Sequence, residues 1–166
     1  FAICTKYKTE ESRRTGVVSK ARLSESFTIE AGEEREFETE IEIPRDTPIY
    51  VGRTKVWVET GLDIDWALDP DDTDYIEVEP SAYEAAVFDA LEDLGFAVHE
   101  AHPVESEQFF ADDRFVQELE FVPRSGPFAG RVDEIELVTH PSERGVGCLL
   151  EVDKRGNLFE EMMDVD

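Results

Sequence analysis

Four aspartates within six residues give the segment Asp69–Asp74 the side chains that bind hard cations. Calcium takes several carboxylate oxygens at once, so this segment is a candidate cation-binding loop. It departs from the EF-hand pattern, because Asp74 stands where that loop needs a glycine and we predict no flanking helices. Asp63 and Asp65 form a carboxylate pair that could act as acid and base. Since 41 of the 166 residues are acidic, a solvated acidic surface explains both groups more simply.

The three histidines, His99, His102 and His140, are the other candidate metal ligands. His99 and His102 are spaced like two ligands on a helix, but we predict a strand here, on which positions three apart face opposite sides. The chain also lacks a G-x-S-x-G nucleophile elbow and a glycine-rich phosphate loop. We therefore predict no catalytic residue, no cofactor-binding residue and no metal ligand, in a protein that is not an enzyme. A cation-binding protein or an enzyme that uses Asp69–Asp74 is the alternative.

Acidic residues dominate the sequence: 41 Asp and Glu stand against 16 Lys and Arg, a formal net charge of −25. They recur along the whole chain rather than in one tail, and only five lysines are present. Concentrated salt screens repulsion between such carboxylates, because the Debye length is about 3 Å at 1 M. We therefore expect a folded, halophilic protein with an acidic surface. The same charge excludes an ordinary nucleic-acid-binding surface, which needs clustered Lys and Arg.

The sequence contains no candidate membrane span or secretion signal. No apolar run approaches the roughly 20 residues of a spanning helix, and the N-terminus lacks a basic segment followed by an apolar one. Cys4 and Cys148 are too few and too far apart for a disulfide framework. Because both lie among apolar residues, we predict buried thiols in a cytoplasmic protein.

Apolar residues that alternate with charged ones predict strands on both sides of one helical segment. The predicted strands are Phe27–Ile29, Phe37–Ile43, Lys55–Thr60, Tyr75–Val78, Phe96–Val98, Phe115–Phe121, Val132–Thr139 and Val146–Val152. Short strands separated by regular turn signals are typical of β-sandwiches rather than of parallel βαβ units. The sequence thus predicts an all-β protein with two blocks of strands.

One helix is predicted between the two blocks. Ser81 and Glu84 form an S-x-x-E capping box, and Gly95 supplies the left-handed residue that ends a helix. The residues expected on its inner face are Tyr83, Val87, Ala90, Leu91 and Leu94, and those expected on its surface include Glu84, Asp89, Glu92 and Asp93.

Two motifs are more specific than these patterns. The first is Asp46-Thr47-Pro48 and the residues that follow it to Val58, continued by Gly61-Leu62-Asp63-Ile64 and Asp69-Pro70. The second is Phe115–Phe121, followed by Phe128–Glu134. Together they resemble the sporulation-control protein family of bacteria and archaea, and the resemblance extends over nearly the whole chain. With the acidic composition, it points to a haloarchaeal member.

The resemblance implies an arrestin-like fold, a pair of immunoglobulin-like β-sandwiches joined by a short helix-containing linker. On this basis residues 1–80 belong to the N-terminal sandwich, 81–95 form the connecting helix, and 96–166 belong to the C-terminal sandwich, with the chain truncated at both ends. The family implies a regulatory adaptor that binds other proteins and supplies no catalytic residues. Self-association through exposed strand edges is a further alternative.

Overall fold

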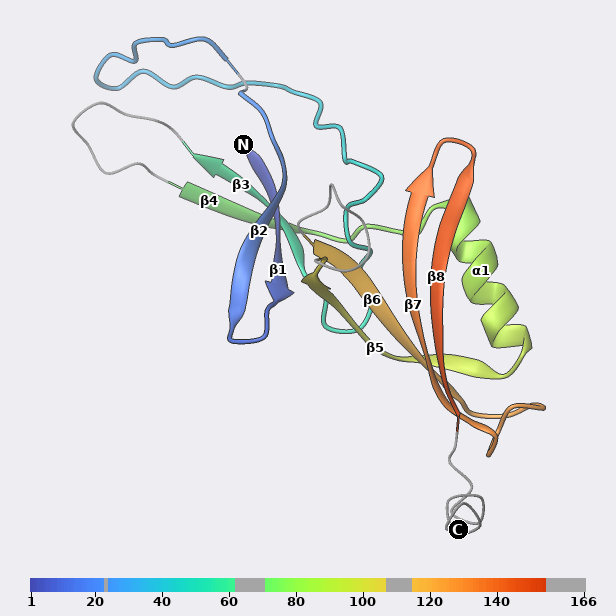
Figure 1. Ribbon diagram of the computed structural model, residues 1–166. Coiled ribbons are helices and arrows are strands. Elements are labelled where there is room, and N and C mark those ends of the chain that lie inside the picture. The colour runs from blue at the N-terminus through green and yellow to red at the C-terminus, as the bar shows by residue number, and fades with distance from the viewer. Residues whose placement is uncertain (23, 62–70, 107–114, 155–166) are drawn as a thin grey trace, which may run out of the picture.

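The computed structural model describes residues 1–22, 24–61, 71–106 and 115–154. The first block of strands contains β1 (Ala2–Lys8), β2 (Arg13–Lys20), β3 (Val56–Gly61) and β4 (Asp71–Ile76). A single helix, α1 (Ala82–Asp93), follows in the described part of the chain (Figure 1). The second block contains β5 (Phe96–Glu105), β6 (Phe115–Pro123), β7 (Val132–Ser142) and β8 (Gly145–Lys154).

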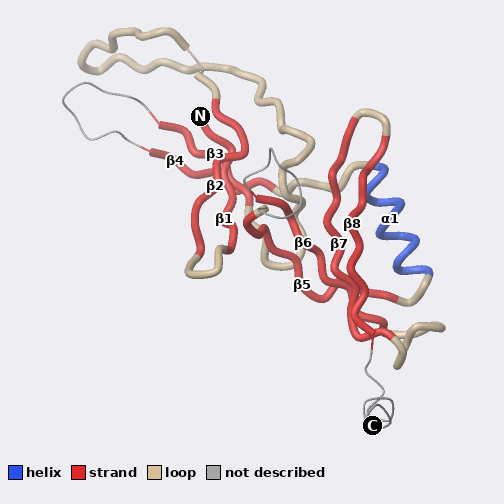
Figure 2. The backbone as a smooth tube through the Cα atoms, in the orientation of Figure 1, coloured by secondary structure: helices blue, strands red, loops and turns tan. Residues whose placement is uncertain are grey.

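The strands join into one sheet with the order β4-β3-β1-β5-β6-β7-β8, and β2 pairs with β1 outside this path. Strands β5 to β8 form an antiparallel meander. The two blocks meet where β1 runs parallel to β5, at the pair Lys8 and Val104. Figure 2 shows the two groups of strands on either side of this point. The domain boundaries at residues 80 and 95 fall between the groups and stay a prediction.

The second block holds the main core between the sheet and α1. Leu119 and Phe121 of β6 and Leu137 of β7 are nearly inaccessible, and they pack with Leu91 of α1. The ring of Phe88 on α1 lies 5.9 Å from that of Phe121, measured between centroids. One face of the β5–β8 sheet is therefore covered by the helix.

Helix α1 begins with the predicted capping box. The backbone N–H of Glu84 donates to Ser81 Oγ (3.3 Å), and Ser81 N–H donates to Glu84 Oε2 (2.9 Å). The predicted inner face is partly wrong, because Glu84 and Leu91 are buried whereas Tyr83 is 49% and Leu94 43% exposed. The helix is rotated toward Glu84, whose Oε1 accepts a hydrogen bond from Thr139 Oγ1 on β7 (2.9 Å).

Residues 49–54, which lie in the first sequence motif, are fastened to the second block by Gln117 of β6. Gln117 Oε1 accepts from the Ile49 N–H (2.8 Å), and Nε2 donates to the Ile49 carbonyl and to Thr54 Oγ1 (both 2.9 Å). Thr54 Oγ1 donates in turn to the carbonyl of Ala101 on β5 (3.2 Å). Gly52, with φ +60°, approaches Ala101 so closely that a Cβ would lie 3.0 Å from its backbone nitrogen. The motif therefore forms a junction between the blocks.

Two of the predicted strands are wrong. Phe27–Ile29 and Phe37–Ile43 form no ladder, and the chain there makes a long excursion that turns at residues 31–32 (Figure 2). The rings of Phe27 and Phe37 pack at 5.0 Å, yet Phe37 remains 52% exposed. Alternation specifies an extended chain with an apolar side, but a strand also needs a neighbour for its hydrogen bonds.

Two further expectations need correction, and one strand was not predicted. Asp71 to Asp74 belong to β4 rather than to a loop, and they pair with residues 58–61 of β3. The sequence patterns did not identify β2, whose residues show no clear alternation. Cys4 is buried as expected, but Cys148 is exposed because it lies on β8, the last strand of the sheet.

Candidate functional site

Four glutamates lie directly opposite one another across the second block. Glu100 on β5 pairs with Glu120 on β6, Glu120 with Glu136 on β7, and Glu136 with Glu151 on β8. Residues paired in this way project from the same face of a sheet. We call this row the glutamate ladder. It lies on the face opposite to the one that α1 covers, since its members alternate along the strands with core residues such as Leu119 and Leu137.

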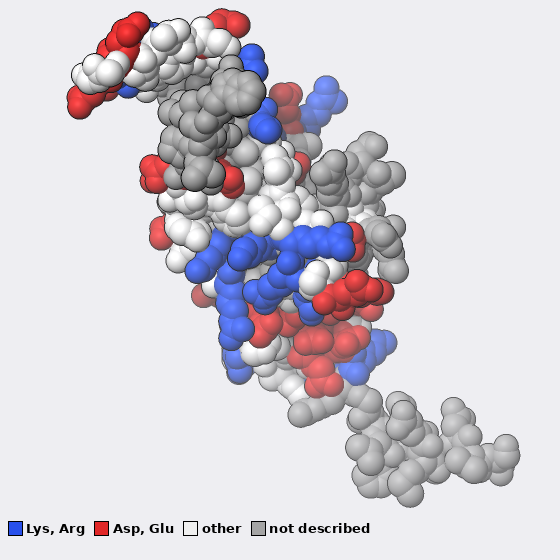
Figure 3. Space-filling model, turned by 90° about the vertical axis from the view of Figure 1, so that its left-hand side faces the viewer, with Lys and Arg blue, Asp and Glu red and all other residues white. Residues whose placement is uncertain are grey.

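More ionisable groups flank the ladder. Glu118 on β6 and Glu134 on β7 each stand two positions from a ladder residue and so share its face. His102 pairs with Glu118, with Nε2 3.6 Å from Glu118 Oε1. On one side of the molecule, Asp and Glu side chains gather beside a band of Lys and Arg side chains (Figure 3). The protein thus concentrates charge of both signs within one surface.

The crowded carboxylates disturb one another's ionisation. Burial raises the pKa of Glu118, the charge of Glu120 raises it further, and Lys8 opposes the shift. Burial is also the largest cause of the raised pKa of Glu136, followed by the charges of Glu118 and Glu151. Like charges directly opposite one another destabilise a sheet. The ladder therefore opposes folding when its members are all ionised.

This repulsion makes stability depend on pH. Because the pKa of folded Glu136 is raised, the folded state binds more protons than the unfolded state between the ordinary glutamate value and the raised value. The free energy of unfolding then falls as the pH rises through that window. We expect Glu136→Gln to stabilise the protein at pH 7 by about 0.2–1 kcal/mol and to add less near pH 5.

Urea unfolding at both pH values measures this effect, at a constant salt concentration that keeps the parent protein folded. Glu92→Gln is the matched control, because Glu92 is exposed on α1 and its replacement makes the same change of charge. A stabilisation by Glu136→Gln that matched the control, or that did not vary with pH, would contradict the assignment of repulsion to the ladder.

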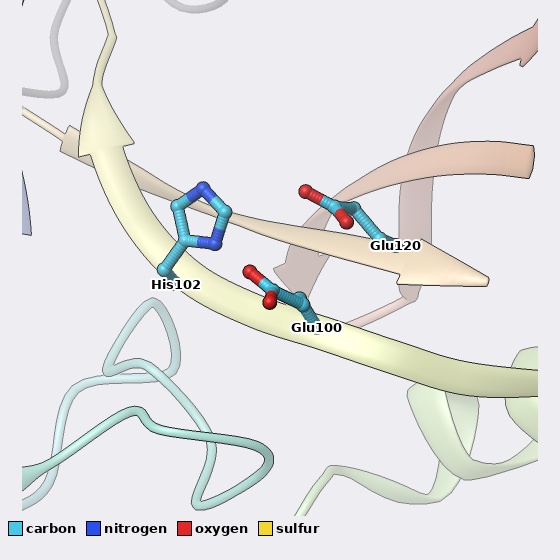
Figure 4. Close-up of side chains that lie close together, drawn as sticks. All are labelled: Glu100, His102 and Glu120. Carbon is cyan, nitrogen blue, oxygen red and sulfur yellow. The ribbon is translucent and has the colours of Figure 1, made fainter.

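Glu100, His102 and Glu120 are the group in the described ranges best placed to hold a metal ion. One ligand atom of each lies within 4.8 Å of the others, and Figure 4 shows the side chains close together over β5 and β6. Carboxylate oxygen and imidazole nitrogen suit zinc and similar divalent metals. Tetrahedral zinc holds its ligand atoms about 3.4 Å apart. The three side chains would therefore have to draw together around an ion.

The sequence patterns did not reveal this group. They pointed to His102 together with His99 and His140, neither of which belongs to it. The spacing of Glu100 and His102 places them on the same face of a strand, but only the pairing of β5 with β6 places Glu120 beside them. Of the other candidates, Asp63, Asp65 and Asp69 lie outside the described residues. Asp72 and Asp74 of β4 are exposed.

The described residues include no helix that is long and apolar enough to cross a membrane. Comparison with known proteins gives one consistent relationship. The sporulation-control protein Spo0M of Bacillus subtilis (strain 168) is 41% identical over 146 residues, which are 88% of this chain and 57% of that protein. The chain therefore spans little more than half the length of this relative.

The fold gives the same relationship. The crystal structure of Spo0M from Bacillus subtilis matches with a TM-score of 0.86 and 33% sequence identity, covering 99% of this chain and 71% of the other. This match confirms the predicted all-β, arrestin-like fold class. The profile of the family described as SpoOM protein matches residues 1–156. With nearly its whole length matched in sequence and in fold, the chain belongs to the Spo0M family of sporulation-control proteins.

Proposed function

We propose that this protein is a non-enzymatic regulatory adaptor of the cytoplasm, which acts by binding other proteins. Membership of the Spo0M family supports a regulatory role, because the matched relative is named a sporulation-control protein. The partner is a protein with an exposed cluster of Lys or Arg side chains. The process that it regulates is defined by that partner rather than by the relative's name.

The glutamate ladder is the observation on which this proposal rests. The hydrogen bonds of four adjacent strands hold the backbone of these glutamates in a row, so only their side chains need ordering when a partner binds. Their mutual repulsion is relieved when positive charges approach. The row of negative charges attracts a partner that carries positive charges and accelerates its association. The ladder is thus suited to recognise a basic surface.

Synthetic peptides test the proposal directly. We expect a twelve-residue peptide that alternates lysine with serine to bind, with an affinity that falls as salt increases. A peptide in which glutamate replaces each lysine should not bind. Replacing two ladder residues, Glu120→Gln with Glu136→Gln, should weaken binding about fivefold, because each ion pair at these half-buried positions contributes about 0.5 kcal/mol. Fluorescence anisotropy measures these affinities.

The matched control removes the same two charges from α1, as Glu92→Gln with Asp93→Asn, at two exposed positions. If both double variants lose affinity equally, only net charge matters and the ladder is not the docking surface. The competing function is self-association along β8, where Leu149, Leu150 and Val152 are 42–46% exposed at the end of the sheet. Light scattering that finds a stable dimer without peptide would favour that alternative.

A further inference from the structure

A pocket of about 430 Å³ opens at the beginning of α1, on the helix side of the sheet. Figure 1 shows α1 beginning beside the turn between β7 and β8. The walls of the pocket are formed by three parts of the chain: residues 43–49, residues 77–84, and Pro141 with Ser142 of β7. Because the glutamate ladder projects from the opposite face, this pocket is a separate feature.

The pocket contains a buried carboxylate that lacks a positive partner. Glu84 is only 5% exposed, and no Lys, Arg or His forms an ion pair with it in residues 1–22, 24–61, 71–106 and 115–154. Its oxygens accept hydrogen bonds from Ser81 N–H and Thr139 Oγ1, and each can accept another. The helix N-terminus stabilises its charge in part. Buried carboxylates are nevertheless usually paired with a cation.

A second group in the wall also lacks a partner. Thr47 is 4% exposed, and its Oγ1 is the one buried side-chain oxygen or nitrogen in the described residues without a hydrogen bond. Its backbone N–H donates to the Pro44 carbonyl (3.1 Å), so this backbone donor is satisfied whereas the hydroxyl is not. A buried hydroxyl without a partner destabilises the fold. A ligand that donates a hydrogen bond would remove this defect.

The remaining lining defines the chemistry of the ligand. Glu77 and Glu79 add two further carboxylates, against Arg45 as the single cation in the wall. Apolar surface comes from Ile43, Ile49, Val78 and two prolines. Negative charge above an apolar wall suits a positive group on an aliphatic stem.

We propose that this pocket binds an alkylammonium group. The ammonium lies toward Glu84 and donates to Thr47 Oγ1, while the stem contacts the apolar wall. The group can belong to a free diamine or to a lysine side chain of a protein. This assignment does not rest on the proposed function, because that function uses the other face of the sheet.

Nuclear magnetic resonance titration of the isotope-labelled protein tests the pocket. The probes are 1,5-diaminopentane, Nα-acetyl-lysine methylamide and, as a neutral analogue of the second, Nα-acetyl-norleucine methylamide. We expect at least one of the two amines to shift the amide signals of Thr47, Ser81 and Glu84, and the neutral analogue to leave them unchanged. Binding by the diamine alone identifies a free amine as the ligand, and binding by the lysine derivative identifies a protein side chain.

Three variants complete the test. Glu84→Gln should weaken binding about tenfold, because glutamine keeps an acceptor oxygen but lacks the negative charge that strengthens a hydrogen bond from an ammonium group. Thr47→Val should weaken it severalfold without unfolding the protein, since the hydroxyl has no partner to lose. The control Glu92→Gln should change nothing. If Glu84→Gln fails to fold because it weakens the helix cap, the binding measured with Thr47→Val decides whether the pocket holds the amine. Equal binding of the neutral analogue, equal binding by Thr47→Val, or no binding of either amine would overturn the proposal.

Discussion

Gly95→Ala is expected to destabilise the protein by about 2–4 kcal/mol, more than a positive φ alone explains. Gly95 has φ +90° directly after α1, and a Cβ at this position would overlap the carbonyl oxygen of Ser125. The obstacle is backbone, and it is held in place because Gly95 O accepts hydrogen bonds from the N–H groups of Arg124 and Ser125 (2.8 and 3.1 Å). Neither side can move without breaking the contact between the helix end and the turn after β6.

Gly32→Ala is the matched control. Gly32 has nearly the same φ, +83°, but a Cβ there would meet nothing within 4 Å. Its replacement should therefore cost only the conformational term, about 1–2 kcal/mol. Urea unfolding followed by circular dichroism measures both variants under identical salt. Equal losses of unfolding free energy at the two positions would show that the backbone of Ser125 moves aside, and would contradict a rigid contact.

The beginning and end of α1 could be predicted because both depend on local chemistry. A capping box needs two side chains three residues apart, and a left-handed stop needs one glycine. The buried face was harder, because Glu84 looks like a surface residue in a chain this acidic. Glu84 accepts a hydrogen bond from Thr139, which lies 55 residues further along the chain. No local pattern contains that information.

The glutamate ladder shows a similar limit. Alternation in β6 and β7 identifies Glu120 and Glu136 as residues of the polar face of the sheet. Their alignment depends on which strands are neighbours and on register, and a shift of one residue would place them on opposite faces. Phe37–Ile43 is the opposite case: it has a clear alternating pattern but no partner strand among the described residues, so the predicted strand is absent. Strand pairing therefore determines whether an alternating segment forms a strand and which of its residues lie beside one another.

The first sequence motif acquires a physical meaning at the junction between the blocks. Its resemblance to a family could be recognised without knowing what the residues do. In the structure, Gly52 makes room for Ala101, and Thr54 bonds to the same residue. Both interactions place the motif against β5. The residue that completes the junction, Gln117, belongs to the second motif, so the two motifs are parts of one interaction.

Gln117→Leu is accordingly expected to destabilise the protein by about 2–4 kcal/mol. Leucine has a similar size, but it removes one acceptor and two donor contacts and leaves the backbone N–H and C=O of Ile49 without these partners. Ile49 itself is 5% exposed, so water does not readily replace them. The loss should loosen residues 49–54 from β6 and expose the core beneath Ile49.

A double-mutant cycle with Thr54→Val separates this role from simple packing. Because Gln117 Nε2 donates to Thr54 Oγ1, the two substitutions should be coupled by about 1 kcal/mol, so that their joint effect is smaller than the sum. Gln117→Glu keeps the acceptor for the Ile49 N–H but turns the donor into a second acceptor, which faces the Ile49 carbonyl. It should therefore be more damaging at pH 7 than near pH 4, where protonation restores a donor. Full additivity in the cycle, together with a cost below about 0.5 kcal/mol for Gln117→Leu, would mean that apolar packing holds the junction. Coupling with the expected pH dependence would instead establish one glutamine side chain as the link between the two blocks of strands.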